Sequence, residues 1–168
     1  CFLEGEARGI REKEFNFFEQ MFTNQVPYSI LIPRQIIFDI GLYDEKMKLG
    51  YEDWEINIRL GSKNFFGKRL KKSLFHYSVS NSGMLISRSI KNHIFIWNYI
   101  KNKNPNLYKN KSVISIFFQW CFKKSNYPIG LVFLWYLILN FFPQMITLRI
   151  FLSLRKIKSF FRKSVLTK

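Results

Sequence analysis

The sequence predicts an α/β domain followed by apolar and basic amphipathic helices, and three observations support this prediction. Before residue 102, short apolar runs alternate with apolar residues at helical spacing. The chain is 48% hydrophobic, which is enough to form a core. All 11 carboxylates precede Ile56, whereas an uncharged stretch over 125–148 leads into a basic terminal segment. The two ends of the chain therefore have different chemistry.

The first elements are short. The stretch 12–21 is predicted to form a helix that places Phe15, Phe18 and Phe22 on one side. The apolar run 28–32, ended by Pro33, predicts a buried strand. Apolar residues at helical spacing over 34–40 predict a short helix that ends at Gly41. A strand leading into a short helix is expected here.

A longer helix is predicted over 52–60 and is expected to end at Gly61. Within it, Glu55 and Arg59 are four residues apart, the spacing at which opposite charges pair on a helix surface. A further strand is predicted within 68–77. Residues 81–83 are expected to turn, and 87–101 to form a helix whose apolar face carries Ile90, Ile94, Trp97 and Ile100.

The composition divides the chain at residues 102–111, which are rich in Asn, Lys and Pro and are predicted to be a linker. Residues 1–101 would form the α/β part and 112–168 a membrane-associating helical tail. A helix over 125–148 would reach about 36 Å, enough for a hydrocarbon core about 30 Å thick. Asn140, Pro143 and Gln144 weaken a simple span, so a re-entrant segment and a buried core helix remain alternatives.

The segment 149–168 places apolar residues at helical spacing among basic ones. This pattern is typical of a helix that lies on an anionic membrane with its apolar side in the interface. A solvated helix packed on its own domain is the alternative.

Charge is distributed unevenly: the formal net charge is +16, and no carboxylate follows Glu55. Such a basic stretch needs a negative partner, either an anionic membrane surface or nucleic acid. The uncharged, Phe-rich runs favour the membrane, and no nucleic acid is expected. The two cysteines, Cys1 and Cys121, lack the spacing of a disulfide framework or a metal site, which favours the cytoplasmic face of the membrane. The chain, which opens on Cys1, is expected to be a piece of a longer protein.

The run Gly50-Tyr51-Glu52-Asp53-Trp54-Glu55 concentrates three carboxylates at the start of the predicted helix. Unpaired N–H groups and the helix dipole at that position stabilise an ionised carboxylate, so Asp53 is expected to be charged at neutral pH. An ionised carboxylate can act as a general base. Acidic residues at helix starts also serve simply as caps, and the spacing by itself leaves both readings open.

Three strings together carry a resemblance to a known family: Ser29-Ile30-Leu31-Ile32-Pro33-Arg34, Ile40-Gly41-Leu42-Tyr43-Asp44-Glu45, and Gly50 to Glu55 with Arg59-Leu60. In order and spacing they resemble the second half of family 2 glycosyltransferases. The resemblance covers roughly residues 26–85, including Ser73-Leu74-Phe75-His76-Tyr77. It implies the second half of a GT-A fold, and transfer of a sugar from a nucleotide-sugar donor to a glycan or lipid-linked acceptor hydroxyl.

The resemblance also implies roles for individual residues. Asp53 matches the carboxylate that takes the proton from the acceptor hydroxyl, so that the reaction inverts the anomeric centre. Glu52 would orient Asp53 or contact the acceptor. Trp54 would form an apolar wall against a sugar or, as the favoured alternative, anchor the helix in the core. Asp44 and Glu45 match an acidic pair that usually forms a structural turn.

A divalent metal, Mg²⁺ or Mn²⁺, is expected for the complete enzyme, because the family usually neutralises the leaving diphosphate with one. The sequence has no Asp-x-Asp, so the main metal ligands and the donor site are expected outside this chain, and the chain alone is expected to be inactive. His76 is a minor candidate for a metal ligand, and His93 on a predicted helix face has no assigned role.

Two functions of other classes compete with the enzyme. One is a non-enzymatic adaptor that binds membranes through its basic tail, peripherally or as an integral protein. The other is a basic RNA-binding module, whose affinity would fall steeply with salt. The enzyme reading predicts a role in making a cell-envelope polysaccharide.

Overall fold

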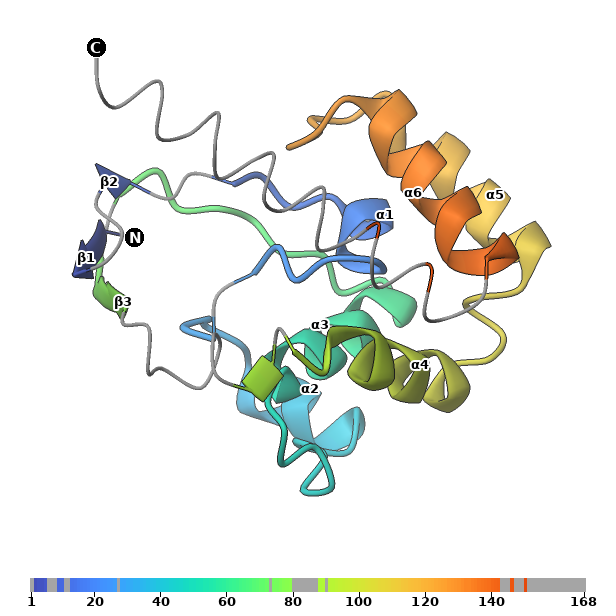
Figure 1. Ribbon diagram of the computed structural model, residues 1–168. Helices are drawn as coiled ribbons and strands as arrows, with labels where there is room; N and C mark the ends of the chain where they lie inside the picture. The colour runs from blue at the N-terminus through green and yellow to red at the C-terminus, as the bar shows by residue number, and fades with distance from the viewer. Residues whose placement is uncertain are drawn as a thin grey trace, which may run out of the picture. The chain divides into compact units, whose positions relative to one another are not determined.

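The structure is a computed structural model, in which the elements occur in the order β1, β2, α1, α2, α3, β3, α4, α5 and α6 (Figure 1). It describes residues 2–5, 9–10, 13–26, 28–72, 74–79, 88–89, 91–142, 146 and 150. Its contacts divide the chain into two units, 1–129 and 130–168. The described part contains both helices and strands and is mainly helical.

The strands are short and form one three-stranded sheet in the order β2-β1-β3. β1 (Phe2–Gly5) pairs with β2 (Gly9–Ile10) in antiparallel fashion and with β3 (His76–Val79) in parallel fashion. The strand predicted within 68–77 therefore begins only at His76. The strand predicted over 28–32 is wrong: these residues form no strand, and Leu31 is 94% exposed. An apolar run can form a buried strand only where a neighbouring strand or layer covers it.

α1 (Phe17–Gln20) is shorter than the helix predicted over 12–21. Asn16 starts the helix late, because its extended backbone is not helical and its side-chain oxygen accepts a hydrogen bond from the Glu19 N–H at 3.2 Å. Phe17 and Phe18 are nevertheless buried, as an apolar side on this segment requires.

α2 (Arg34–Asp39) confirms the helix predicted over 34–40. Pro33 stands just before it, where the missing N–H costs nothing. Gly41 follows the helix with φ of 88°, a left-handed conformation that glycine adopts without strain.

α3 (Glu52–Ser62) confirms the second predicted helix but not its predicted end. Gly61 lies inside the helix rather than terminating it. A Cβ at Gly61 would lie 1.9 Å from Cε2 of Phe17, so the missing side chain makes room for that ring. Close packing against α1, not helix termination, explains this glycine.

α4 (His93–Lys103) begins later than the helix predicted over 87–101, and α5 (Asn110–Trp120) follows a short connection. That connection is not a loose linker. The Tyr108 hydroxyl donates to the Met21 carbonyl at 2.7 Å, and the Tyr108 ring contacts those of Phe22 and Trp97. Together with the packing of α5 on α1, this places 102–120 in the first unit rather than in a linker and tail.

The core of the first unit lies among α1, α3, α4 and α5, and α3 and α4 run side by side in Figure 1. Trp54 and Trp97 are among its largest fully buried side chains. The other buried apolar residues here include Phe17, Phe18, Met21, Phe22, Ile56, Ile58, Leu60, Ile94, Ile96, Ile100, Val113 and Trp120. The core therefore anchors α3 along most of its length.

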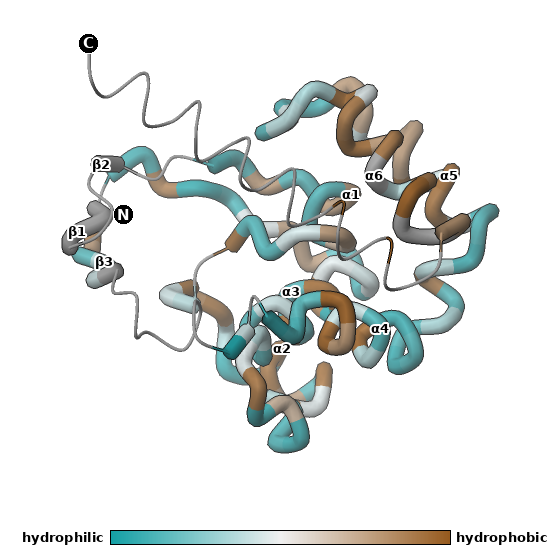
Figure 2. The backbone as a smooth tube through the Cα atoms, viewed as in Figure 1, coloured by the Kyte–Doolittle hydropathy of each residue, from teal (hydrophilic) through white to brown (hydrophobic). Residues whose placement is uncertain are grey.

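α6 (Ile129–Phe141) begins at the end of the first unit and is apolar along most of its length (Figure 2). It occupies 13 of the 24 uncharged residues. Within the part of the chain that the structure describes, no helix is both long and apolar enough to cross a membrane. The predicted turn at 81–83 and nearly all of the basic segment over 149–168 lie outside the described residues.

Candidate functional site

The site begins at a sharp backbone turn before α3. Gly50 and Tyr51 both have positive φ values, 96° and 64°. Tyr51 then caps the helix through its backbone, because its carbonyl accepts a hydrogen bond from the Glu55 N–H at 3.1 Å. A left-handed tyrosine is an uncommon and strained conformation. The turn places Glu52 and Asp53 as the first two residues of α3.

Asp53 is half-buried and held by two hydrogen bonds. Its Oδ2 accepts from the Asn24 side chain at 2.9 Å, and its Oδ1 accepts from the Trp54 N–H at 2.8 Å. Asn24 is itself oriented by Gln20, whose side-chain N–H donates to Asn24 Oδ1 at 3.4 Å. Among the described residues no cation pairs with Asp53. The carboxylate is thus fixed in place but not neutralised.

The pKa of Asp53 is raised above the ordinary value of 3.8. Burial is the largest cause, and the negative charge of Glu52 adds to it, whereas the hydrogen bonds from Asn24 and the backbone act in the opposite direction. The helix start was expected to stabilise the charge, and burial outweighs that stabilisation here. A raised pKa makes Asp53 a stronger base than an exposed aspartate.

Tyr43 is a site residue that the sequence did not single out. The pKa of its hydroxyl is raised, first by burial and then by the negative charges of Asp53 and Glu52. The ring is 42% exposed, so Tyr43 lies where the two carboxylates meet solvent. Its position depends on the loop after α2, which spacing along the chain does not place beside α3.

Trp54 is fully buried, which is the position that the core alternative predicted. Its indole N–H donates to the Gln20 carbonyl at 2.6 Å, and its ring stacks on His93 with centroids 5.2 Å apart. A wall against a sugar requires an exposed ring face, which Trp54 does not offer. His93, which had no assigned role, is a core residue beneath it.

Glu55 has no exposed surface and lies in an ion network. Arg59 Nε donates to both carboxylate oxygens, at 2.8 and 3.0 Å, which confirms the predicted pair. Lys103, from the end of α4, adds a second cation at 2.8 Å. The negative charge of Glu55 is therefore fully neutralised inside the fold.

The same network fixes the loop after α2. Arg59 donates from its other nitrogens to the carbonyls of Ile40 and Leu42. Asp44 accepts from Lys103 at 2.7 Å and from the Tyr99 hydroxyl at 2.9 Å. The hydrogen bond from Lys103 is the largest cause that lowers the pKa of Asp44 to about 2. The backbone N–H of Lys46 also donates to Asp44, as a structural turn requires.

The structure does not bring a metal site together around these residues. His76 lies in β3, paired in register with Phe2. Within the described ranges no three or more His, Cys, Asp or Glu side chains gather as metal ligands. In that part of the chain, Glu52 and Asp53 are therefore not joined by a third such side chain.

Comparisons with known proteins add no relative: no family model matches the chain, and neither a curated protein nor a solved structure matches it. The chemistry of the site therefore rests on its own residues.

Proposed function

We propose that this chain supplies the acceptor half of an inverting glycosyltransferase, in which Asp53 is the general base. One observation carries the proposal: the Asp53 carboxylate is held by Asn24 without a cation partner in the described part of the chain. Its raised pKa supports the same role. A carboxylate used only for folding is usually paired, as Glu55 is. The resemblance of the motif to family 2 glycosyltransferases points in the same direction.

In the proposed reaction Asp53 takes the proton of the acceptor hydroxyl as that oxygen attacks the anomeric carbon of the donor. The new bond joins the acceptor oxygen to the anomeric carbon, and the bond from that carbon to the diphosphate oxygen breaks on the opposite face. The nucleotide diphosphate leaves with the electron pair, and the anomeric configuration inverts. The proton remains on Asp53 until solvent removes it.

The neighbours of Asp53 have supporting roles in this proposal. Asn24 fixes the carboxylate through its hydrogen bond to Oδ2. Glu52 favours the protonated form of Asp53, which makes Asp53 a better proton acceptor. Tyr43, partly exposed beside both carboxylates, is positioned to hydrogen-bond an acceptor sugar.

We expect the donor site to lie outside this chain, because the sequence contains no Asp-x-Asp. A divalent metal bound to the complete enzyme would neutralise the leaving diphosphate. We therefore expect no sugar transfer by the 168-residue chain alone.

The test is sugar transfer by a protein that carries the donor-binding half together with this chain. Asp53→Asn should lower the transfer rate by at least about a hundredfold, the usual contribution of a general base. Asp39→Asn is the matched control, because it makes the same change at an exposed aspartate at the end of α2, and it should retain most of the rate. Unchanged transfer by Asp53→Asn would rule out the role as base.

The adaptor is tested by removing the proposed membrane anchor, starting at the boundary between the two units. Because α5 belongs to the first unit, deletion should begin at residue 130 rather than 112. Loss of membrane binding with transfer retained would separate anchoring from catalysis.

A further inference from the structure

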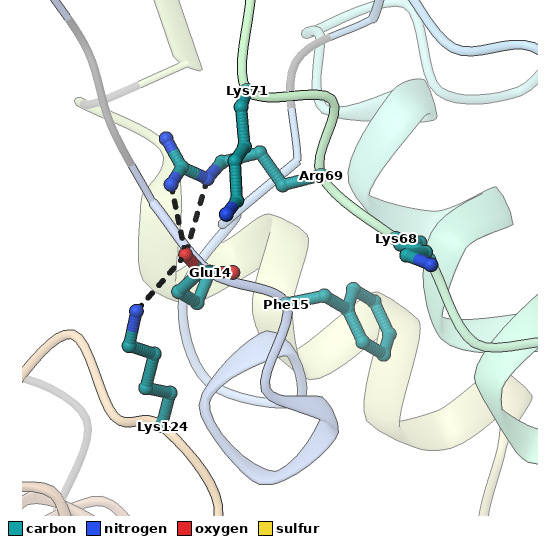
Figure 3. Close-up of a pocket in the computed structure, with 7 residues that line it drawn as sticks. Glu14, Phe15, Lys68, Arg69, Lys71 and Lys124 are labelled. Carbon is teal, nitrogen blue, oxygen red and sulfur yellow. Dashed lines mark hydrogen bonds and ion pairs between the residues drawn. The ribbon is translucent and has the colours of Figure 1, made fainter.

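A basic pocket of about 310 Å³ lies in the first unit, and no step of the proposed reaction uses it. Three segments meet there: the one before α1, the one between α3 and β3, and the one after α5 (Figure 3). Its lining consists of four basic side chains, one carboxylate, an aromatic ring and a glycine: Lys68, Arg69, Lys71, Lys124, Glu14, Phe15 and Gly67.

The floor of the pocket is built on the core. The Phe15 ring packs edge-on against Trp120, with centroids 5.6 Å apart, and against Phe66 at 6.2 Å. Gly67 comes so close to Phe15 that a Cβ there would lie 3.2 Å from the ring. The pocket therefore keeps its shape because its floor is packed.

Glu14 shows where an anion binds in this pocket. Its Oε1 accepts from Arg69 Nη2 at 3.0 Å and from Arg69 Nε at 3.2 Å, and lies 3.5 Å from Lys124 Nζ. In Figure 3 the side chain of Lys71 also reaches toward this pair. Among the described lining residues, Arg69 and Lys124 pair with Glu14, and Lys68 and Lys71 add further positive charge. These residues therefore keep a surplus of positive charge that a second anion can neutralise.

The position of Glu14 is fixed by its backbone. Its N–H donates to Asn126 Oδ1 at 2.9 Å, and its carbonyl accepts from Asn126 Nδ2 at 2.8 Å. The Arg69 side chain is only 25% exposed, whereas Lys124 is 80% exposed. A largely buried guanidinium at the wall with exposed lysines at the rim suits a phosphate, which Arg binds through two parallel N–H groups.

Apolar side chains on the same segment favour a lipid over a free phosphate. Leu70 and Leu74 are 60% and 66% exposed, although large apolar residues are usually buried. They alternate with Lys and Arg between α3 and β3, where Figure 2 shows a hydrophilic segment interrupted by apolar residues. Basic and apolar side chains side by side match the two parts of an anionic lipid.

We propose that this pocket binds the phosphate of an anionic lipid, with Arg69, Lys71 and Lys124 on the phosphate and Leu70 and Leu74 against the acyl chains. The site is distinct from the uncharged and basic terminal segments as a route to the membrane. It does not depend on sugar transfer, so a failed transfer assay leaves it standing.

The test is calorimetric titration of the full chain with dihexanoyl phosphatidic acid, a short-chain soluble lipid that presents one phosphate. The double variant Lys71→Gln/Lys124→Gln should weaken binding by at least about tenfold, because two lysines near the phosphate are lost. The matched control Lys109→Gln/Lys111→Gln removes the same charge from exposed positions at the start of α5 and should change binding less than about twofold. Equal weakening by both variants, or no binding by the unmodified chain, would overturn the site.

Two further titrations distinguish a lipid from other phosphate ligands. Glycerol 3-phosphate should bind more weakly than the lipid, and Leu70→Ser/Leu74→Ser should abolish that difference. Glycerol 3-phosphate that binds as tightly as the lipid would refute the lipid assignment. Glu14→Gln should tighten binding of both probes, because it removes the competing carboxylate; weaker binding would contradict the role given to Glu14.

Discussion

Two carboxylates in the first turn of α3, buried Glu55 and half-buried Asp53, are held in opposite ways. Glu55 is fully buried, and Arg59 and Lys103 neutralise it. Asp53, two residues earlier, is held by an amide and a backbone N–H without a cation among the described residues. The pKa of Asp53 is raised by burial and by Glu52.

This difference predicts opposite effects on stability when each of the two carboxylates is removed. Removing one partner of a buried ion pair is costly, because the remaining charge is left uncompensated. Removing a carboxylate whose charge is disfavoured in the folded chain costs little. The negative charge of Glu55 therefore stabilises the fold, whereas that of Asp53 does not.

The largest effect is expected for Glu55→Gln, which leaves Arg59 and Lys103 without their shared carboxylate. The free energy of unfolding should fall by about 3 kcal/mol, measured by urea denaturation at pH 7. Glu52→Gln, the control at the first residue of the helix, should change it by less than about 0.5 kcal/mol. Equal losses of unfolding free energy from both variants would contradict the special role of the buried Glu55 ion network.

A smaller effect is expected at the far end of α3, where packing rather than charge holds the helix. Gly61→Ala puts a Cβ into the Phe17 ring and should cost about 2 kcal/mol of unfolding free energy. Adding Phe17→Leu to Gly61→Ala should recover part of that loss, because the smaller side chain makes room. A double variant as unstable as the sum of the two single ones would show that the two residues are independent.

The pH dependence of stability should also reveal the contribution of the Asp44 carboxylate. Asp44 has a folded pKa of about 2, below its ordinary 3.8, so its contribution is present above about pH 4 and is lost as pH falls toward 2. Asp44→Asn should therefore flatten the acid side of the stability curve, measured by urea denaturation between pH 5 and pH 3. An unchanged slope would mean that Lys103 does not stabilise the ionised form of Asp44.

The smallest effect is expected for Asp53→Asn. The raised folded pKa means that the ionised form is disfavoured in the folded chain, so ionised Asp53 contributes a destabilisation that is relieved as pH falls. At pH 7 the variant should keep the unfolding free energy within about 0.5 kcal/mol or increase it. A large loss of stability would show that Asp53 is structural after all.

Local patterns in the sequence predicted local structure correctly. Helical spacing gave α2 and α3, and the four-residue spacing gave the Glu55–Arg59 pair, because these depend on neighbours along the chain. The strand predicted over 28–32 failed, because a strand depends on what covers it. The predicted end of α3 was wrong for a similar reason, because Gly61 makes room for the ring of Phe17, which is distant in sequence.

The surroundings of the candidate base were the least predictable part. Asp53 stands in a motif, but Asn24 reaches it across 29 positions, and no spacing rule signals that contact. Lys103 reaches Asp44 across 59 positions in the same way. Such contacts follow from how α1, α3 and α4 pack, which composition and periodicity do not specify.

The most direct test of this account is the pKa of the Asp53 carboxyl, measured by carbon NMR titration of the 168-residue chain with Asp53→Asn to assign the signal. A half-buried carboxylate without a cation, next to Glu52, should titrate above 3.8. A value at or below 3.8 would mean that Asp53 is stabilised as an ordinary helix cap, which would contradict its proposed role as base.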